Sequence, residues 1–226
     1  MNAPFDSRKD KFIHDLKTLV NIDSGSDNMA GIEKVARFLA GRLEAIGLAV
    51  ALEKLGWRGV PGLQAGNAAS DQPADLLMLG HMDTVFPAGE VARRPFAIAG
   101  DRATGPGVCD MKGGLLVALH VLETLHGRGL LGRLSVKVCF NGDEEVGSRA
   151  SRAWIQAHAA NSRRAFVFEP CRPGYRFVLK RKGGGSFRIS ATGMSAHAGV
   201  EPELGANAAV EIAHQVLAIQ KFNDRV

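Results

Sequence analysis

The sequence predicts an α/β fold in which helices flank a sheet of buried strands. Two observations support this prediction. Apolar residues recur at helical spacing in several segments, and short apolar runs of strand length alternate with these segments. Several of the apolar runs end directly in acidic or imidazole side chains. Because ligands collect at strand ends in sheets of this kind, we expect one functional site along that edge.

The first part of the chain predicts two helices followed by a strand. Apolar residues recur at helical spacing over residues 8–21 and 32–46, and Gly47 ends the second helix. Residues 24–28 between them have the composition of a turn. Residues 48–55 then predict a strand. The stretch 56–74 is rich in Gly, Pro, Asn and Asp, and could contain a short edge strand.

The second part alternates strands and helices. Apolar runs at 76–80, 134–140 and 165–168 predict buried strands. A broad apolar stripe after Gly113-Gly114 predicts a helix, and two more helices are expected at 151–159 and 205–221. We also expect a strand at 183–192. With 226 residues, the chain could form one large domain or one domain with part of another.

Composition excludes several classes of function. Apolar residues make up 46% and charged residues 23%, which is typical of a globular protein in water. The net charge is +5, but the basic residues are scattered and no aromatic residues are interleaved with them, so we expect no nucleic-acid binding. The polar amino terminus and the lack of a long apolar run predict a cytoplasmic protein with no membrane contact. Cys109, Cys139 and Cys171 show no paired spacing, and Cys139 is expected in the core.

The candidate site starts with His81 and Asp83, which end the apolar run at 76–80. Side chains alternate along a strand, so these two point to one face and Met82 points to the other. Taken alone, the pair could equally be hydrogen bonded at the surface. Asp110 lies in a glycine-rich turn before a helix, and this turn fits neither phosphate-binding glycine motif.

Acidic residues also follow the two later strands. Glu144 and Glu145 follow the run at 134–140, and Glu169 follows the run at 165–168. Adjacent acids could form a solvated turn, but they repel one another unless a cation relieves them. Imidazole and carboxylate groups are the ligands expected for zinc or a related divalent ion in a hydrolytic site. Four separate segments therefore predict one shared metal site.

In their order, four motifs resemble those of the dinuclear zinc peptidases and deacylases of peptidase family M20. The motifs are Gly80-His81-Met82-Asp83-Thr84-Val85, Asp110-Met111-Lys112-Gly113-Gly114, Asp143-Glu144-Glu145-Val146-Gly147-Ser148 and Ser195-Ala196-His197-Ala198-Gly199. Residues 195–206 look most like the glutamate carboxypeptidase branch. The resemblance implies a mixed three-layer α/β/α zinc-exopeptidase-like catalytic domain at 1–181. It also implies the start of an inserted α+β lid, or dimerisation, domain at 182–226.

The resemblance also implies a role for each candidate residue. His81 and Glu169 would bind one zinc ion, Glu145 would bind the other, and Asp110 would bridge both, with cobalt or manganese as possible replacements. Glu144 would be the general base, and Asp83 would orient the His81 ring through its other nitrogen. His197 would help bind the substrate carbonyl across a homodimer interface. A cis peptide bond between Asp110 and Met111 is implied as well.

The implied activity is hydrolysis of an amide bond next to a free carboxylate, most simply release of a carboxyl-terminal amino acid. The alternative within the family is an N-acyl amino acid deacylase. The family pattern places a further histidine ligand after the lid, and the 226 residues contain no segment that matches it. We therefore expect a truncated chain, and a non-catalytic metal-binding fragment or one half of a split enzyme stays open. His214 is expected at a helix surface.

Overall fold

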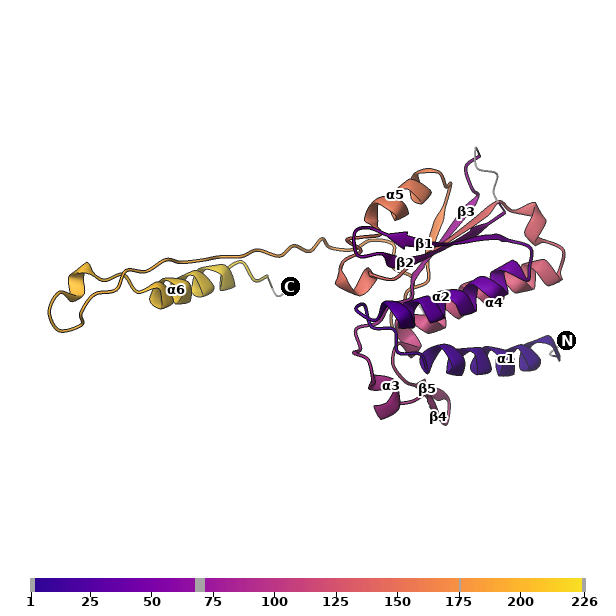
Figure 1. Ribbon diagram of the computed structural model, residues 1–226, viewed down its shortest axis with the longest axis horizontal. Coiled ribbons are helices and arrows are strands. Elements are labelled where there is room, and N and C mark those ends of the chain that lie inside the picture. The colour runs from indigo at the N-terminus through magenta and orange to yellow at the C-terminus, as the bar shows by residue number, and fades with distance from the viewer. Residues whose placement is uncertain (1–2, 68–71, 175, 225–226) are drawn as a thin grey trace. The chain divides into compact units, whose positions relative to one another are not determined.

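The computed structural model describes residues 3–67, 72–174 and 176–224. Contacts within the chain divide it into two compact units, Met1–Arg176 and Phe177–Val226, which are considered separately (Figure 1). This division falls a few residues before the expected boundary between residues 181 and 182. The identification of the units as a catalytic and a lid domain stays a prediction.

The first unit contains a mixed sheet of five strands in the order β1-β2-β6-β3-β7. Their bounds are Ala49–Leu55 for β1, Val60–Gly66 for β2, Val136–Asn141 for β6, Leu76–His81 for β3 and Ala165–Val167 for β7. The pairs β1·β2 and β2·β6 are antiparallel, whereas β3 pairs in parallel with both β6 and β7. The predicted mixed α/β fold is confirmed. Because β6, β3 and β7 run in parallel, their carboxyl ends meet at one edge of the sheet.

Residues 56–74 contain the strand β2, but it is not the edge strand that was considered there, and residues 68–71 of that stretch lie outside the described chain. β2 pairs with β1 through the whole of its length, from Val60 opposite Leu55 to Gly66 opposite Ala49. It lies inside the sheet, between β1 and β6, and not at an edge. Gly56 and Gly59 in the connecting turn have positive φ angles of 58° and 63°, which glycine adopts without steric cost. The short turn therefore permits the β1–β2 hairpin, which the composition of residues 56–74 did not reveal.

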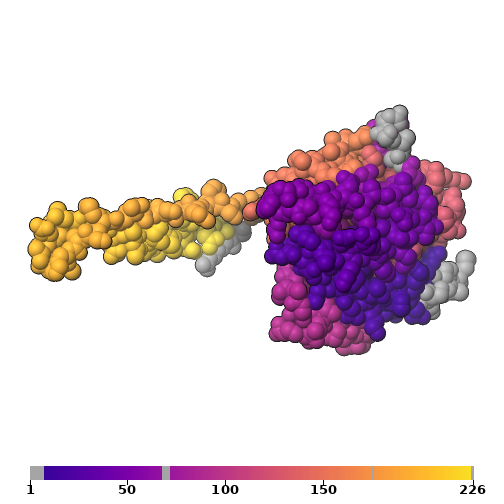
Figure 2. Space-filling model, viewed as in Figure 1, coloured from indigo at the N-terminus to yellow at the C-terminus, as the bar shows by residue number. Residues whose placement is uncertain are grey.

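Helices flank both faces of the sheet, as predicted (Figure 1). The helices α2 (Met29–Glu44) and α4 (Gly113–Gly127) cover one face, with α1 (Ala3–Val20) beyond them, and α5 (Arg152–Ala160) covers the other. Segments from the first part of the chain cover much of the viewed face of this unit in Figure 2. The smaller elements are α3 (Glu90–Arg93), β4 (Ala97–Ala99), β5 (Arg102–Thr104), a π-helical turn (Val108–Lys112) and the 3₁₀ turns Leu131–Arg133 and Glu144–Val146.

The core of the first unit lies between the sheet and the helices α2 and α4. Fully buried side chains from both layers meet there, among them Leu39, Met78, Leu115 and Phe140. Burying a side chain of this size contributes about 1.5–3 kcal/mol relative to leaving it exposed. The packed core therefore fixes β3 and the start of α4, the two elements that carry the candidate ligands.

The second unit contains the helix α6 (Ala208–Gln220) and the 3₁₀ turn Pro202–Leu204. The side chain of Asn207 caps α6 by accepting hydrogen bonds from the backbone N–H groups of Ala209 and Val210. The helix expected at 205–221 is thus confirmed. The strand expected at 183–192 is wrong for the described residues, since this segment has no ladder partner there and a strand requires one.

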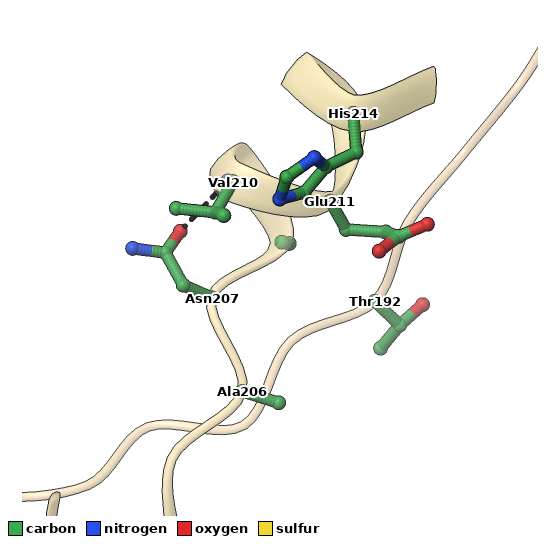
Figure 3. Close-up of a pocket in the computed structure, with 7 residues that line it drawn as sticks. Thr192, Ala206, Asn207, Val210, Glu211 and His214 are labelled. Atoms are coloured by element: carbon green, nitrogen blue, oxygen red, sulfur yellow. Dashed lines mark hydrogen bonds between the residues drawn. The ribbon is translucent and has the colours of Figure 1, made fainter. Parts of the chain in front are cut away.

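A hollow of about 450 Å³ lies at the amino-terminal end of α6 (Figure 3). Its polar lining consists of Thr192, Asn207, Glu211 and His214. His214 is exposed on α6, in agreement with the expectation that it lies at a surface. Among the described helices of the whole chain, none is long and apolar enough to cross a membrane.

Candidate metal centre

His81 is the last residue of β3, and its side chain is almost fully buried. Its backbone N–H donates a hydrogen bond to Sδ of Met111, 3.1 Å away. Gly80 permits this contact, because a Cβ atom there would lie 2.8 Å from Cε of Met111 and 3.0 Å from Cδ2 of Leu115. The end of β3 is therefore packed directly against the turn that carries Asp110.

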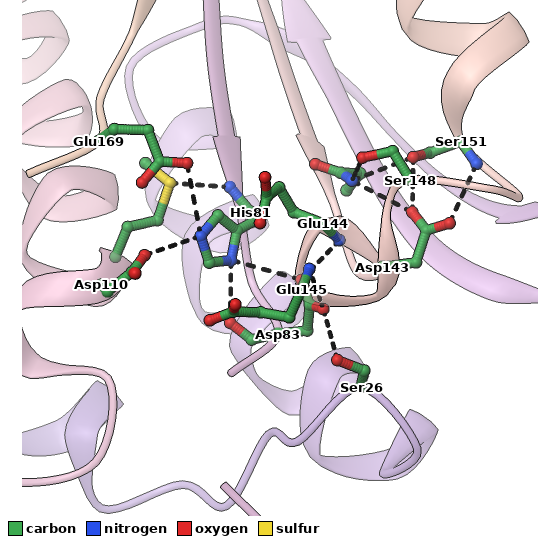
Figure 4. Close-up of polar contacts among 12 residues, drawn as sticks. Ser26, His81, Asp83, Asp110, Asp143, Glu144, Glu145, Ser148, Ser151 and Glu169 are labelled. Carbon is green, nitrogen blue, oxygen red and sulfur yellow. Dashed lines mark hydrogen bonds and ion pairs between the residues drawn. The ribbon is translucent and has the colours of Figure 1, made fainter. Parts of the chain in front are cut away.

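Three candidate ligands meet at this point, as Figure 4 shows. Nε2 of His81 lies 3.0 Å from Oδ1 of Asp110 and 3.6 Å from Oε1 of Glu169. One nitrogen or oxygen atom from each of the three residues lies within 4.8 Å of the other two. His81 and Glu169 are 88 positions apart in the chain and still converge. They do so because β3 and β7 end at the same edge of the sheet, with the turn before α4 beside them.

Asp110 reaches the site through a turn that leaves the helical path. Its backbone angles are φ −113° and ψ 100°, and the peptide bond to Met111 is cis, as the sequence resemblance implied. Gly107 opens the turn with a φ of +69°. Lys112 then points inward, where its buried Nζ donates a 2.7 Å hydrogen bond to the carbonyl oxygen of Ile22. The turn is therefore attached to the loop between α1 and α2.

Glu169 follows β7 and is held in place through its neighbour Phe168. The N–H of Phe168 donates a hydrogen bond to the carbonyl oxygen of Leu79, so the segment continues alongside β3. Gly114 lies against the same residue, and a Cβ atom there would be only 1.9 Å from the carbonyl oxygen of Phe168. The second glycine of the Asp-Met-Lys-Gly-Gly motif therefore permits Glu169 to lie beside Asp110.

Asp83 is buried behind His81 and accepts three hydrogen bonds from other segments. The donors are Ser26 Oγ at 2.7 Å, the N–H of Glu144 at 3.1 Å and the N–H of Glu145 at 3.2 Å. Nδ1 of His81 lies 3.0 Å from the backbone oxygen of Asp83 and 3.4 Å from its Oδ1. An acceptor at Nδ1 leaves Nε2 facing the cluster, which is the arrangement that a metal-ligating histidine needs.

The three adjacent acids at the end of β6 have different environments. Asp143 is buried and accepts hydrogen bonds from Asn141 Nδ2, from the N–H groups of Ala150 and Ser151, and from Ser151 Oγ. Glu144 is exposed, and Glu145 is partly buried. The protein itself therefore satisfies one acid and leaves the other two facing the site, as Figure 4 shows.

The electrostatics of the cluster favour positive charge. Burial favours the neutral imidazole of His81, but the hydrogen bond and charge of Asp83 and the charges of Glu169 and Glu144 outweigh it and raise its pKa to about 9. Burial, together with the charges of Asp110 and Glu144, raises the pKa of Glu169 to about 7, against the opposing effect of His81. Burial also raises the pKa of Glu145. Crowded carboxylates of this kind are relieved by a bound cation.

The donor set fits a divalent metal ion. One imidazole nitrogen and two carboxylate oxygens are ligands that zinc accepts, and their separation permits all three to contact one ion. The structure brings together the predicted residues His81, Asp110 and Glu169, with Asp83, Glu144 and Glu145 around them. His197 lies in the second unit, where its Nδ1 accepts a hydrogen bond from the N–H of Gly199. The individual roles of these residues stay predictions.

Two residues of the site were not recognised from the sequence. Ser26 lies in a segment whose composition indicated only a turn, and no local signal marks its contact with Asp83. Lys112 belongs to the Asp-Met-Lys-Gly-Gly motif, but its burial was not predicted. Lys112 directly precedes α4, and no local signal marked its burial, because lysine is rarely buried without a partner.

Comparisons with known proteins identify the family of the chain. Residues 77–222 match the model of peptidase family M20/M25/M40. The chain is 37% identical over 214 residues to carboxypeptidase G2 of Pseudomonas sp. (strain RS-16), covering 94% of this chain and 52% of that protein. It is 31% identical over 132 residues to succinyl-diaminopimelate desuccinylase of Gluconacetobacter diazotrophicus, covering 54% of this chain and 34% of that protein. The chain therefore spans about half the length of carboxypeptidase G2. Its match to the desuccinylase covers a smaller share of that protein.

Solved structures share the fold. An M20 family metallo-carboxypeptidase, Sso-CP2 from Sulfolobus solfataricus, superimposes with a TM-score of 0.59 at 23% identity, covering 74% of this chain and 39% of that one. Human carnosine dipeptidase 1 superimposes with a TM-score of 0.63 at 19% identity, covering 74% of this chain and 40% of that one. At these identities the structures support the fold alone and not a particular substrate.

Proposed function

The chain belongs to peptidase family M20/M25/M40, and from this premise we propose that it forms the metal-binding part of a zinc-dependent carboxypeptidase. The proposed reaction is hydrolysis of an amide bond next to a free carboxylate, with release of a carboxyl-terminal amino acid. The observation that carries the proposal is the convergence of His81, Asp110 and Glu169 within 4.8 Å. The similarity to carboxypeptidase G2 over 94% of the chain supports the choice of reaction.

The proposed zinc ligands are His81, Asp110 and Glu169. A bound divalent ion would supply Lewis acidity, which lowers the pKa of a water molecule toward neutrality and polarises the scissile carbonyl group. Asp110 is exposed, and with Glu145 it would hold a second ion, as the family resemblance implies. Cobalt or manganese would suit the same nitrogen and oxygen ligands.

The remaining residues would handle the proton and the orientation of the ligands. Glu144 is not one of the three converging ligands, and its charge acts on both His81 and Glu169, so its carboxylate lies near these two side chains. It would take a proton from the attacking water and pass it to the nitrogen of the leaving amine. Asp83 would hold the backbone of Glu144 and Glu145 in register with His81.

A deacylase of the same family is the second candidate. The 31% identity to succinyl-diaminopimelate desuccinylase favours it, although that match covers only 54% of the chain. Both candidates cleave an amide bond and would use the same metal ligands. They differ in the substrate, and a peptide with a carboxyl-terminal glutamate and an N-succinyl amine would separate them.

Zinc titration of the purified chain by calorimetry, with hydrolysis of both substrate classes measured in parallel, tests the proposal. We expect zinc binding that His81→Ala abolishes, while His126→Ala, at the exposed end of α4, leaves it unchanged. Release of glutamate from the peptide supports the carboxypeptidase, and release of succinate from the N-succinyl amine supports the deacylase. Zinc binding without hydrolysis supports the non-catalytic metal-binding fragment. Failure of the wild-type chain to bind zinc, cobalt or manganese contradicts all three.

We also propose that the second unit mediates homodimer formation, as the resemblance implies. Its helix α6 exposes Val210, Val216, Leu217 and Ile219, and apolar side chains grouped on one helix are typical of an association surface. Analytical ultracentrifugation of the wild-type chain and of Leu217→Glu tests this proposal. A dimer that the substitution dissociates supports it, and a wild-type monomer at all concentrations contradicts it.

A further inference from the structure

The loop between α1 and α2 carries a hydroxyl group that contacts the support of the metal centre. Ser26 Oγ donates a 2.7 Å hydrogen bond to Oδ2 of Asp83, which is 57 residues later in the chain. Asp83 lies directly behind His81 and is almost fully buried. Ser26 contacts Asp83, and Asp83 contacts the candidate ligand His81. Any effect of Ser26 on a metal ion would therefore act through Asp83.

Three donors bind the two oxygens of the Asp83 carboxylate. The N–H of Glu144 donates to Oδ1, whereas the N–H of Glu145 and the hydroxyl of Ser26 both donate to Oδ2. Ser26 is the side-chain donor of this set, and the other two are backbone groups of the turn after β6. The hydroxyl therefore restrains the rotation of the carboxylate together with the N–H of Glu145, which donates to the same oxygen.

The backbone around Ser26 is fixed in the same place. The N–H of Ser26 donates to the carbonyl oxygen of Thr84, and the N–H of Thr84 donates to the carbonyl oxygen of Ser24. Gly25 lies so close to the segment after β3 that a Cβ atom there would be 2.2 Å from the carbonyl oxygen of Phe86. The loop is thus attached to the residues on the carboxyl side of Asp83, and the Ser26 hydroxyl has a defined position.

We propose that Ser26 is a positioning residue of the metal centre, acting through Asp83 on the orientation of the His81 imidazole. The proposal rests on the proposed function, because it assumes that His81 binds zinc. Groups that are hydrogen bonded to metal ligands set the orientation of those ligands. Their loss typically lowers metal affinity by about 10–100-fold. Ser26 lies one contact further out, and we expect the lower end of that range.

The same loop provides a matched control. Ser24 is buried, and its Oγ has no hydrogen-bond partner among the described residues. Ser24→Ala removes a hydroxyl from the same loop without removing a contact to Asp83. Ser26→Ala removes the contact, and Ser26→Thr retains a hydroxyl that can make it.

The experiment measures zinc affinity by competition with a chelator and the visible absorption spectrum of the cobalt-loaded chain. We expect Ser26→Ala to weaken zinc binding by about 10-fold and to change the cobalt spectrum. Ser24→Ala should match the wild type in both, and Ser26→Thr should restore both. The cobalt spectrum reports ligand geometry, which a general loss of stability in the loop would leave unchanged.

Each other outcome overturns the proposal. If Ser26→Ala keeps the wild-type affinity and spectrum, the hydroxyl does not position the ligands. If Ser24→Ala and Ser26→Ala weaken binding equally with unchanged spectra, the effect is one of loop stability and the positioning role is wrong. If the wild-type chain binds no metal, the proposed function itself fails, and that result is separate from the comparison among the variants.

Discussion

Nε2 of His81 lies 3.0 Å from Oδ1 of Asp110, although the two residues are 29 positions apart in the chain. The end of β3 supplies one and the glycine-rich turn before α4 supplies the other. Two ligand atoms from separate elements at this distance can both contact one cation. Packing between Gly80, Met111 and Leu115 sets the distance, so the core of the fold and the candidate metal centre depend on the same contacts.

Glu144 faces the site without being one of the three converging ligands, and this predicts that it acts on protons and not on the metal. We expect Glu144→Gln, which keeps the size of the side chain and removes its basicity, to lower kcat by about 10²–10⁴-fold. Zinc affinity should stay within about twofold of the wild type, because His81, Asp110 and Glu169 are unchanged. Steady-state kinetics and zinc titration of the same preparation check this.

Glu145→Ala is the paired variant, and here we expect loss of metal as well as of turnover. Its backbone N–H contact to Asp83 is retained, so only the side chain is tested. Near-normal turnover of Glu144→Gln would show that another group is the base. Full metal content in Glu145→Ala would show that Glu145 is not a ligand.

Asp143, unlike Glu144, is predicted to stabilise the fold. Its carboxylate accepts hydrogen bonds from the N–H groups of Ala150 and Ser151 and from two side chains. Asp143→Ala removes the acceptor of the N–H groups of Ala150 and Ser151, and we expect it to lower the free energy of unfolding by about 2–4 kcal/mol. Urea denaturation measures this. Glu144→Ala, at the neighbouring exposed acid, should change stability by less than about 0.5 kcal/mol, and equal effects of the two variants would contradict the assignment.

The difference between these neighbours shows what the sequence could predict and what it could not. The strands at 76–80, 134–140 and 165–168 and the ligands that follow them were predictable, because apolar runs of strand length and their terminal residues are local features. Which of three consecutive acids points inward depends on the turn, where Asp143 has φ −146° and Gly147 has φ +89°. Backbone angles of this kind do not follow from composition.

Long-range contacts were the other limit. The Ser26–Asp83 hydrogen bond joins segments 57 residues apart, and composition gave only a turn at Ser26. The strand expected at 183–192 failed for a related reason. The resemblance to the family's lid suggested a strand, but a ladder requires a second strand beside it, and the described residues provide none there.

The contact between Gly114 and Phe168 predicts that a single methyl group would disturb Glu169. A Cβ atom at Gly114 would lie 1.9 Å from the carbonyl oxygen of Phe168. We expect Gly114→Ala to lower the free energy of unfolding by about 1–3 kcal/mol through overpacking and to weaken zinc binding by displacing Glu169. Gly127 at the end of the same helix is the control, since a Cβ atom there meets nothing within 4 Å.

For Gly127→Ala we expect a gain of about 0.5 kcal/mol, because alanine restricts the unfolded chain and suits a helix. Zinc affinity should be unchanged. Thermal denaturation and zinc titration of both variants check the pair. Wild-type stability and affinity in Gly114→Ala would contradict the close approach of Phe168.

The burial of Cys139 predicts that the three cysteines react differently. Cys139 lies in β6 and is 1% exposed, whereas Cys109 and Cys171 are exposed. Burial raises the pKa of the Cys139 thiol to about 12, with a smaller opposing effect of Lys137. Because the thiolate is the reactive form, iodoacetamide at pH 8 should label Cys109 and Cys171 in the folded chain and Cys139 only after unfolding. Peptide mass spectrometry measures each site, and rapid labelling of folded Cys139 would contradict its burial.

The same pKa shift predicts how stability depends on pH. In the unfolded chain the thiol of Cys139 has its ordinary pKa near 9, so it loses its proton first as the pH rises. Between pH 9 and 12 the folded state therefore binds more protons than the unfolded state, and the contribution of this group to stability, complete below pH 9, is progressively lost. Urea denaturation of the wild type and of Cys139→Ala between pH 8 and about 10.5 tests this. We expect the variant to be less stable at pH 8 through its smaller side chain, but to lose less stability as the pH rises. Parallel curves for the two proteins would show that Cys139 does not titrate in this way.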